Sequence, residues 1–175
     1  MNLIFYRKVV INMKLSIASK MILRKSPLLP FLYTNFILNS TLEHILPISY
    51  MRHHIHARDI HNIYSTTDKM NQLRCNYEYG VLSKSCYKYE GNIICKKNKI
   101  FYPREKDRGI IARSLLYMRD KYNYTNFGDM TLYEEWNKLY KPTKKEIIHN
   151  EIGYLIQGNL NKYISNYTYK NDNIN

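Results

Sequence analysis

The sequence predicts an α+β fold, with short strands early in the chain and helices late. The segment CYKYEGNIIC, residues 86–95, has the pattern of a β-hairpin. The segment REKDRGIIARSLLYMRDKY, residues 104–122, repeats apolar residues at helical spacing. Two later segments begin with the Thr-x-x-Glu pattern that caps helices. Strands and helices that occur in separate runs are typical of this fold class.

The length of 175 residues suits one domain with additional segments, and 45% hydrophobic residues are enough for a core. We divide the chain into an N-terminal extension (1–39), a compact body (40–165) and a polar tail (166–175). The chain has no apolar run of about 18 residues, so no transmembrane helix is expected. Six basic residues interrupt the apolar stretches of the extension, so no clear signal peptide is seen and the compartment stays open.

The segment YSTTDKMNQLRC, residues 64–75, is expected to be a loop followed by a short helix. Asp68 or a neighbouring Thr can accept hydrogen bonds from the first N–H groups of this helix. Met70 and Leu73 would face inward. Asn71 then lies in the first turn.

In the hairpin, Glu90-Gly91 suits a two-residue turn. On that register Cys86 faces Cys95 at a non-hydrogen-bonded position, with Cα atoms about 4.5 Å apart. A disulfide is geometrically allowed at that distance, although only an oxidising compartment would maintain it. Two thiols packed across a reduced hairpin fit the sequence equally well. Cys75 has no partner left.

Within the helix over 104–122, Gly109 is unfavourable by about 1 kcal/mol, which indicates a packing or ligand-approach reason for it. The next helix is expected to begin with a capping box formed by Thr131 and Glu134, and the last with one formed by Thr143 and Glu146. Gly158 is expected to end that last helix.

The charge balance favours a polyanionic partner. Lys and Arg number 27 against 14 Asp and Glu, a formal net charge of +13. Nucleic acid and an acidic membrane surface both fit such a field. The abundance of Lys, Asn, Ile and Tyr is also what AT-rich coding DNA produces, which reduces the weight of the charge argument.

Four of the six histidines lie between His53 and His61, in MRHHIHARDIH. Zinc sites usually combine paired ligands at regular spacing, often with Cys, and no Cys-x-x-Cys is present. A basic, partly exposed loop near phosphate fits this segment better than a zinc site. His149, within an expected helix, is assigned a structural role.

Glu43-His44, in LEHILP, is the candidate for chemistry. Phosphodiester hydrolysis needs a base to activate water and a cation to take up charge on the phosphate. Asn71 could add a neutral oxygen ligand, and Mg²⁺ keeps several waters, so two protein ligands are enough. In a regular strand successive side chains point to opposite faces, so both residues could serve one site only if the chain bends there. A buried, structurally satisfied His is the alternative.

The order of several segments supports the catalytic interpretation. They are EHILP (43–47), ARDIHNI (57–63), MNQLRCNYEYG (70–80), FYP (101–103), RGIIARSLLYMRDKY (108–122), Trp136 and NEIGYLIQGNLNKYI (150–164). In this order and spacing the sequence resembles the endonuclease I family of non-specific nucleases, which have the ββα-metal (His-Me finger) fold. The resemblance covers residues 42–164.

The resemblance implies roles by position. His44 corresponds to the general base, and Glu43 and Asn71 correspond to the ligands of a divalent cation, which is Mg²⁺ or else Mn²⁺ or Ca²⁺. Such enzymes leave 5′-phosphate ends. Family members are usually secreted or periplasmic. Four arginines are candidates for contact with nucleic acid: Arg52, Arg58, Arg74 and Arg113.

The sequence departs from the family pattern in places. Cys75 stands where the Arg-Gly-Asn stretch has Gly, so that turn is expected to differ. The segment after Glu43-His44 is short, which leaves Arg52 or Arg58 as the choice for a phosphate-steadying arginine. Arg74 and Arg113 could equally anchor helices by ion pairs. Gln157, Asn159 and Asn161 are expected to satisfy backbone groups, and Trp136 to pack in the core.

The resulting hypothesis is a Mg²⁺-dependent, sequence-tolerant endonuclease that acts on DNA, with RNA as a second substrate class, and that is a monomer without a transmembrane segment. The alternative is a catalytically inactive basic protein that binds nucleic acid. A third possibility is a membrane-surface protein that uses residues 1–39, although that segment shows no clean amphipathic stripe.

The two readings of the hairpin cysteines predict different masses. A bridge between Cys86 and Cys95 makes the intact protein about 2 Da heavier after reduction, because two thiol hydrogens are added. Mass spectrometry of freshly isolated protein with and without reductant measures this difference. Two alkylatable thiols at these positions before reduction would exclude the bridge.

Overall fold

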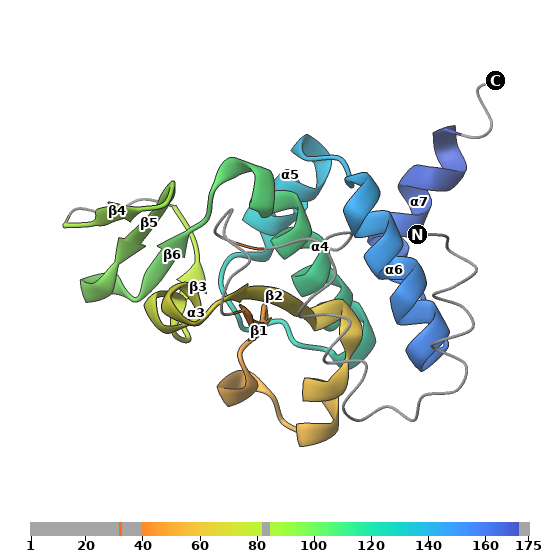
Figure 1. The fold of residues 1–175 in the computed structure, drawn as a ribbon, viewed down its shortest axis with the longest axis horizontal. Helices are drawn as coiled ribbons and strands as arrows, with labels where there is room; N and C mark the ends of the chain where they lie inside the picture. The colour runs from red at the N-terminus through yellow and green to blue at the C-terminus, as the bar shows by residue number, and fades with distance from the viewer. Residues whose placement is uncertain (1–31, 33–39, 82–84, 172–175) are drawn as a thin grey trace.

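β1 (Ser40–His44) and β2 (Ile63–Thr67) form an antiparallel pair at the middle of the molecule, and α3 (Asp68–Arg74) follows β2 directly (Figure 1). The computed structural model describes residues 32, 40–81 and 85–171. It is a mixed α+β structure, which confirms the predicted fold class.

A second sheet carries the predicted hairpin. Its strand order is β3-β6-β5-β4, with bounds Glu78–Tyr79, Ile100–Tyr102, Asn92–Cys95 and Tyr87–Tyr89. β3 pairs parallel to β6, and the other pairs are antiparallel. The hairpin register is as predicted, from Tyr87 opposite Ile94 to Tyr89 opposite Asn92.

The turn and the cysteines also follow the prediction. Glu90 and Gly91 both have positive φ, +46° and +79°, as a tight hairpin turn requires. Cys86 and Cys95 form a disulfide, with Cα atoms 4.3 Å apart. Cys75 is a free, exposed thiol.

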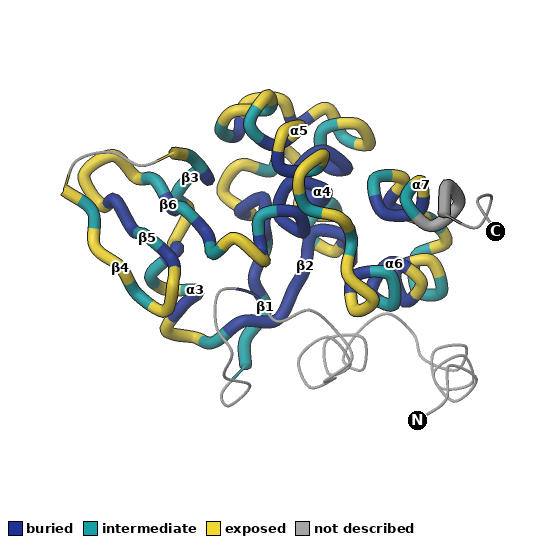
Figure 2. Tube along the Cα trace, turned by 90° about the horizontal axis from the view of Figure 1, so that it is seen from above, coloured by how far each residue is buried: buried dark blue, intermediate teal, exposed yellow. Residues whose placement is uncertain are grey.

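Four helices make up the second half of the molecule: α4 (Glu105–Tyr122), α5 (Met130–Leu139), α6 (Lys144–Gln157) and α7 (Lys162–Asn171). α4 is the central helix, and α5 and α7 pack against it (Figure 1). Residues 109–118 of α4 are all buried, so the helix is enclosed around its whole circumference there (Figure 2). α7 continues to Asn171, into the segment 166–175 that we assigned to the polar tail.

Short 3₁₀ turns connect β1 to β2. They are η1 (Ile48–Tyr50), η2 (His54–Arg58) and η3 (Ile60–Asn62). A fourth, η4 (Lys96–Asn98), links β5 to β6. The histidine-rich segment therefore lies in η2 and η3, between the two strands that begin the fold.

Two local predictions were wrong. Residues 64–67, expected to be a loop, belong to β2, although Thr67, one of the predicted capping residues, does cap α3 by accepting from Met70 N–H. α5 is capped by Asp129, whose carboxylate accepts from the N–H groups of Thr131 and Leu132, so the box predicted at Thr131 does not form.

The other helix signals were confirmed in part or in full. Thr143 caps α6 by accepting from Glu146 N–H. The Glu146 carboxylate does not return to the cap, since it forms a buried ion pair with Arg113 (2.6 Å). Gly158 ends α6 at φ +81°.

The structure gives a packing reason for the glycine at position 109, one of the two reasons that its place within a helix predicted. A Cβ at this position would lie 2.6 Å from the Arg113 guanidinium and 2.7 Å from the carbonyl oxygen of Tyr140. Arg113 itself hydrogen-bonds that carbonyl. Gly109 thus makes room for the guanidinium that joins α4 to α6.

The main core lies between α4, α5 and the two sheets, and Trp136 belongs to it, as predicted. Leu32 also packs there, and its N–H donates to Ser65 in β2 (2.9 Å). The rest of the predicted extension, residues 1–31 and 33–39, lies outside the described residues. Among the residues that are described, no helix is both long and apolar enough to cross a membrane.

Buried histidines predict a loss of stability in mild acid. His149 donates from Nε2 to Ile60 (2.9 Å) and stacks on Tyr64, and burial lowers its pKa to about 3. Burial also lowers the pKa of His61. Above pH 6.5 the folded and unfolded forms are both neutral, and below it only the unfolded form binds the proton. The free energy of unfolding should therefore fall as pH drops below about 6.5, by about 2 kcal/mol at pH 5 from His149 alone.

Urea unfolding at pH 7.5 and 5.0 measures this effect. His149→Phe keeps a stacking ring but cannot titrate, so the decrease between the two pH values should be smaller than in the wild type. Equal decreases in the two proteins would show that His149 is not responsible.

Candidate active site and metal centre

Glu43 and His44 are the last two residues of β1, and they differ in burial as strand alternation predicts. The Glu43 side chain is 2% exposed, whereas His44 is half-buried. The Glu43 carboxylate lies 3.2 Å from the guanidinium of Arg74, the last residue of α3. This ion pair brings the end of α3 against the end of β1.

Arg74 attaches to the backbone of the same segment. Its NH1 donates to the carbonyl of His44 (3.3 Å), and its NH2 donates to that of Ile45. The guanidinium also lies over the Tyr79 ring, 4.7 Å from the centroid. These contacts stabilise the chain as it leaves β1, immediately after the Glu-His pair.

Asn71 reaches β1 from the preceding turn of α3. Its amide nitrogen donates to the carbonyl of Leu42 (3.1 Å). The other end of the amide is an oxygen, which can only accept hydrogen bonds or bind a cation. Thr67 caps α3 and so sets where the helix begins, which places Asn71 four residues later, beside β1.

The His44 ring has a defined tautomer. Its Nε2 lies 2.9 Å from the carbonyl oxygen of Ala57 in η2. A carbonyl oxygen can only accept, so Nε2 carries the proton and donates it. In the neutral ring Nδ1 then carries the lone pair that a general base needs.

The donor atoms match a hard cation. One carboxylate and one amide oxygen suit Mg²⁺, which is bound through few protein ligands and keeps several waters. Arg74 and a cation would share the carboxylate of Glu43, whose two oxygens offer about four lone pairs. Among the described residues no group of three or more His, Cys, Asp or Glu side chains could hold a metal, so the histidine-rich segment forms no such site there.

The four candidate arginines have different surroundings. Arg58 is exposed on η2, next in sequence to the Ala57 carbonyl that holds His44. Arg52 is exposed too, but its NH2 donates to the carbonyls of Tyr122 (2.6 Å) and Asn123 (3.2 Å) at the C-terminal end of α4. Arg52 therefore caps a helix that presents acceptor groups there.

Arg74 and Arg113 are each 1% exposed. Arg74 pairs with Glu43, and Arg113 pairs with Glu146 through two hydrogen bonds of 2.6 and 2.7 Å. Their burial favours the alternative that the sequence left open, in which both arginines anchor helices by ion pairs.

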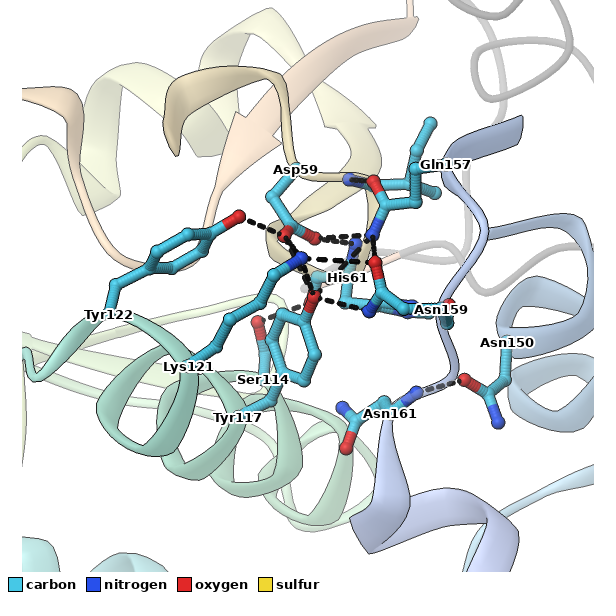
Figure 3. Close-up of polar contacts among 11 residues, drawn as sticks. Asp59, His61, Ser114, Tyr117, Lys121, Tyr122, Asn150, Gln157, Asn159 and Asn161 are labelled. Atoms are coloured by element: carbon cyan, nitrogen blue, oxygen red, sulfur yellow. Dashed lines mark hydrogen bonds and ion pairs between the residues drawn. The ribbon is translucent and has the colours of Figure 1, made fainter. Parts of the chain in front are cut away.

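A polar cluster that sequence reasoning missed surrounds the buried carboxylate of Asp59, near the end of the histidine-rich segment. Figure 3 shows side chains from α4 and from the end of α6 converging on Asp59. We call it the Asp59 cluster; its members are Asp59, Tyr117, Lys121, Tyr122, Gln157 and Asn159. Its only signal in the sequence was that ARDIHNI and QGNLN both belong to the family pattern.

Two of the three amides near the C-terminus, Gln157 and Asn161, satisfy backbone groups as predicted, whereas the side chain of Asn159 contacts a hydroxyl and other side chains. Gln157 accepts from Ile60 N–H (2.9 Å), and Asn159 donates to the Tyr117 hydroxyl (2.7 Å). Asn161 donates to the carbonyl of Arg113 (3.0 Å). They join the loop after α6 to α4 and η3.

Comparison with known proteins found a family model and several relatives that match the sequence. The family model Endonuclease I matches residues 38–168. The chain is 36% identical over 116 residues to Endonuclease-1 of Buchnera aphidicola subsp. Acyrthosiphon pisum, covering 64% of this chain and 46% of that protein. It is 33% identical over 101 residues to an extracellular endonuclease of Pseudomonas fluorescens biotype A, covering 57% and 41%.

A third relative, a periplasmic deoxyribonuclease of Aeromonas hydrophila, is 27% identical over 110 residues, covering 61% of this chain and 46% of that protein. The chain thus spans about half the length of the curated relatives it matches. The match begins just before β1 and ends within α7, so it includes the β1–β2–α3 unit and the Asp59 cluster.

Cys75, at the end of the helix that carries Asn71, predicts a stabilising substitution. Its backbone has φ +54° and ψ −130°, a conformation that glycine adopts readily and that costs other residues about 1–3 kcal/mol. Cys75→Gly should therefore raise the free energy of unfolding by about 1 kcal/mol in denaturant titrations. Cys75→Ala removes the sulfur but keeps Cβ, so it should give no such gain. Equal stabilisation by both variants would assign the effect to the thiol and not to the backbone.

Proposed function

Because the chain belongs to the endonuclease I family, we propose that it is a divalent-metal-dependent endonuclease that hydrolyses phosphodiester bonds of DNA, and also of RNA, without sequence preference. We further propose that β1, β2 and α3 form the ββα-metal core of the enzyme. The order of these elements and the approach of α3 to the end of β1 support this assignment.

The single observation that carries the proposal is the hydrogen bond from His44 Nε2 to the Ala57 carbonyl. It leaves Nδ1 as the basic nitrogen of a ring whose orientation is set. In the proposed reaction Nδ1 removes a proton from water, and the water oxygen attacks phosphorus. The bond to the 3′ oxygen breaks, which leaves the phosphate on the 5′ side.

Glu43 and Asn71 are the proposed ligands of Mg²⁺, or of Mn²⁺ or Ca²⁺ in its place. When bound, the cation supplies positive charge that stabilises the transition state and the leaving oxygen. The protein's own part is to hold the two ligands on adjoining elements. Arg74 fixes the Glu43 carboxylate, and the hydrogen bond to Leu42 fixes the Asn71 amide.

Arg58 is the proposed contact to the phosphate, because it is exposed and adjoins the residue that orients His44. A net charge of +13 adds a general attraction for the polyanionic substrate. Contacts to phosphate carry no sequence information, which agrees with cleavage that tolerates any sequence. Arg52 acts indirectly in this proposal, by attaching the histidine-rich segment to the end of α4.

One observation favours the second candidate, an inactive protein that binds nucleic acid. The Arg74 guanidinium already neutralises the Glu43 carboxylate, which weakens its attraction for a cation. This candidate predicts binding that falls steeply with salt concentration, and no cleavage at any metal concentration.

Plasmid nicking tests the proposal. Cleavage should require Mg²⁺ and stop with EDTA, and His44→Ala should reduce kcat by about 10²–10⁴-fold because the general base is lost. His54→Ala is a matched control, because His54 is an exposed histidine of η2 and should keep nearly full activity. Wild-type activity that equals that of His44→Ala would exclude the enzyme.

The metal ligands give a separate prediction. Glu43→Gln replaces the charged carboxylate by a neutral amide that binds a cation more weakly, and Asn71→Ala removes the amide oxygen. Both should therefore raise the Mg²⁺ concentration needed for half-maximal cleavage by at least about tenfold. Titration of cleavage rate against Mg²⁺, with circular dichroism to show that each variant is folded, measures the effect. An unchanged metal requirement in both variants would place the cation elsewhere.

A further inference from the structure

The orientation of His44 depends on a carbonyl that lies outside any sheet or long helix. Ala57 belongs to η2, a 3₁₀ segment of five residues. Runs of this type longer than three or four residues are uncommon, because their hydrogen bonds have poor geometry. Contacts from elsewhere in the molecule must therefore hold the Ala57 carbonyl in place.

Asp59 holds the C-terminal end of η2. Its backbone N–H donates to His56 (3.1 Å), which closes the last turn around Ala57. Its carboxylate accepts hydrogen bonds from two tyrosine hydroxyls of α4, Tyr117 (2.8 Å) and Tyr122 (2.7 Å). Lys121 and Gln157 each donate to it at 2.9 Å (Figure 3). Asp59 thereby ties the end of η2 to α4 and α6.

Tyr122 holds η2 at a second point. The His56 ring stacks on the Tyr122 ring with centroids 3.9 Å apart, and His56 Nδ1 lies 2.8 Å from the Tyr124 hydroxyl. Tyr122 therefore contacts both the residue before Ala57 and, through its hydroxyl, the residue two positions after it. Ala57 lies between these two attachments.

We infer that Asp59 and Tyr122 are positioning residues for His44: they fix the Ala57 carbonyl, which in turn fixes the tautomer and direction of the His44 ring. The inference rests on the proposed function, in which His44 is the base. It adds a role for a buried carboxylate that the proposed chemistry does not otherwise use.

The charge state of Asp59 suits a permanent support. Burial alone would raise the pKa of its carboxyl, but the hydrogen bonds from Gln157, Lys121 and Tyr122 outweigh burial and leave the pKa below its ordinary value. The carboxylate thus stays ionised and keeps its hydrogen bonds throughout the neutral range. Charged acceptors form hydrogen bonds about twice as strong as neutral ones, so the attachment is rigid.

The same chain offers matched controls at the contact of α4 with α7. Asp120 is a residue of α4 whose carboxylate also accepts from a tyrosine, since Tyr163 OH lies 2.6 Å from it. Asp120 also pairs with Arg119 and Lys162. These partners of Asp120 lie in α4 and α7 and not in η2, so Asp120→Asn and Tyr163→Phe remove similar interactions and leave the contacts of Asp59 and Tyr122 with η2 in place.

The experiment compares Asp59→Asn, Tyr122→Phe and Tyr122→Leu with Asp120→Asn and Tyr163→Phe in the full chain. Proton–nitrogen correlation spectra of the metal-free protein, labelled with ¹⁵N-histidine, report the His44 ring tautomer, and the His44→Ala spectrum assigns its signals. We expect the wild type and both controls to show the Nε2–H form. Asp59→Asn and Tyr122→Leu should show mixed tautomers, with a smaller change in Tyr122→Phe.

Cleavage kinetics give the second readout. Asp59→Asn and Tyr122→Leu should lower kcat by about 10-fold to 100-fold and change KM less than about 2-fold, because a misdirected base slows the chemical step and leaves binding intact. Controls of similar stability should keep their kcat. If Asp59→Asn does not fold, the kcat and tautomer of Tyr122→Phe provide the test, because this variant loses one hydrogen bond to Asp59 and keeps the ring that stacks on His56.

Two results would overturn the inference: an unchanged His44 tautomer in Asp59→Asn and both Tyr122 variants, or losses of kcat no larger than in the two controls. A protein that shows the tautomer changes but never cleaves DNA would support the positioning and refute the proposed function. The two failures are therefore distinguishable.

Discussion

The contact between Arg74 and the end of β1 is the interaction on which the site depends. Taking a guanidinium and a carboxylate out of water costs several kcal/mol per ion, and only close pairing with further hydrogen bonds offsets this. Arg74 meets that condition through Glu43 and the carbonyls of His44 and Ile45. Loss of either partner would leave a buried charge, so α3 and β1 are held together as one unit. Asn71 lies on α3, and Glu43 and His44 lie on β1, so the contact between these two elements sets their relative positions.

The same principle recurs around α4. Arg113 and Glu146 join α4 to α6, and the Asp59 cluster joins α4 to η2 and to the segment after α6. Asp59, Arg113 and Glu146 are buried and hydrogen-bonded, so each link requires a defined geometry and not just apolar contact. Several residues of the family pattern, such as Arg113 and Gln157, therefore hold the helices together. The residues proposed for chemistry are few: Glu43 and His44 at the end of β1, Asn71 on α3 and Arg58 at the end of η2.

Local signals predicted the elements whose geometry is set by near neighbours. The turn at Glu90-Gly91 determined the hairpin register, and with it the approach of Cys86 to Cys95. Gly158 ended α6 because a left-handed residue was needed there. Local signals failed where two nearby residues could each cap the same helix, since Asp129 and not Thr131 caps α5. They also failed for β2, whose polar Ser and Thr residues become buried only through pairing with β1 and contact with Leu32.

By itself the sequence determined the α+β class, the hairpin, the main helices and, through the family pattern, the identity of the candidate base and ligands. Each of these depends on residue type and short spacing, which are visible along the chain. Only the tertiary structure decided that Arg74 and Arg113 are buried ion-pair partners while Arg58 is exposed, and that Ala57 provides the acceptor for His44. Those outcomes depend on contacts between residues that are 13, 29 and 33 positions apart in the sequence. Local sequence patterns do not specify such contacts. The physical reason is that burial and partner choice are properties of the packed chain, since each charge takes the partner that the fold brings within reach.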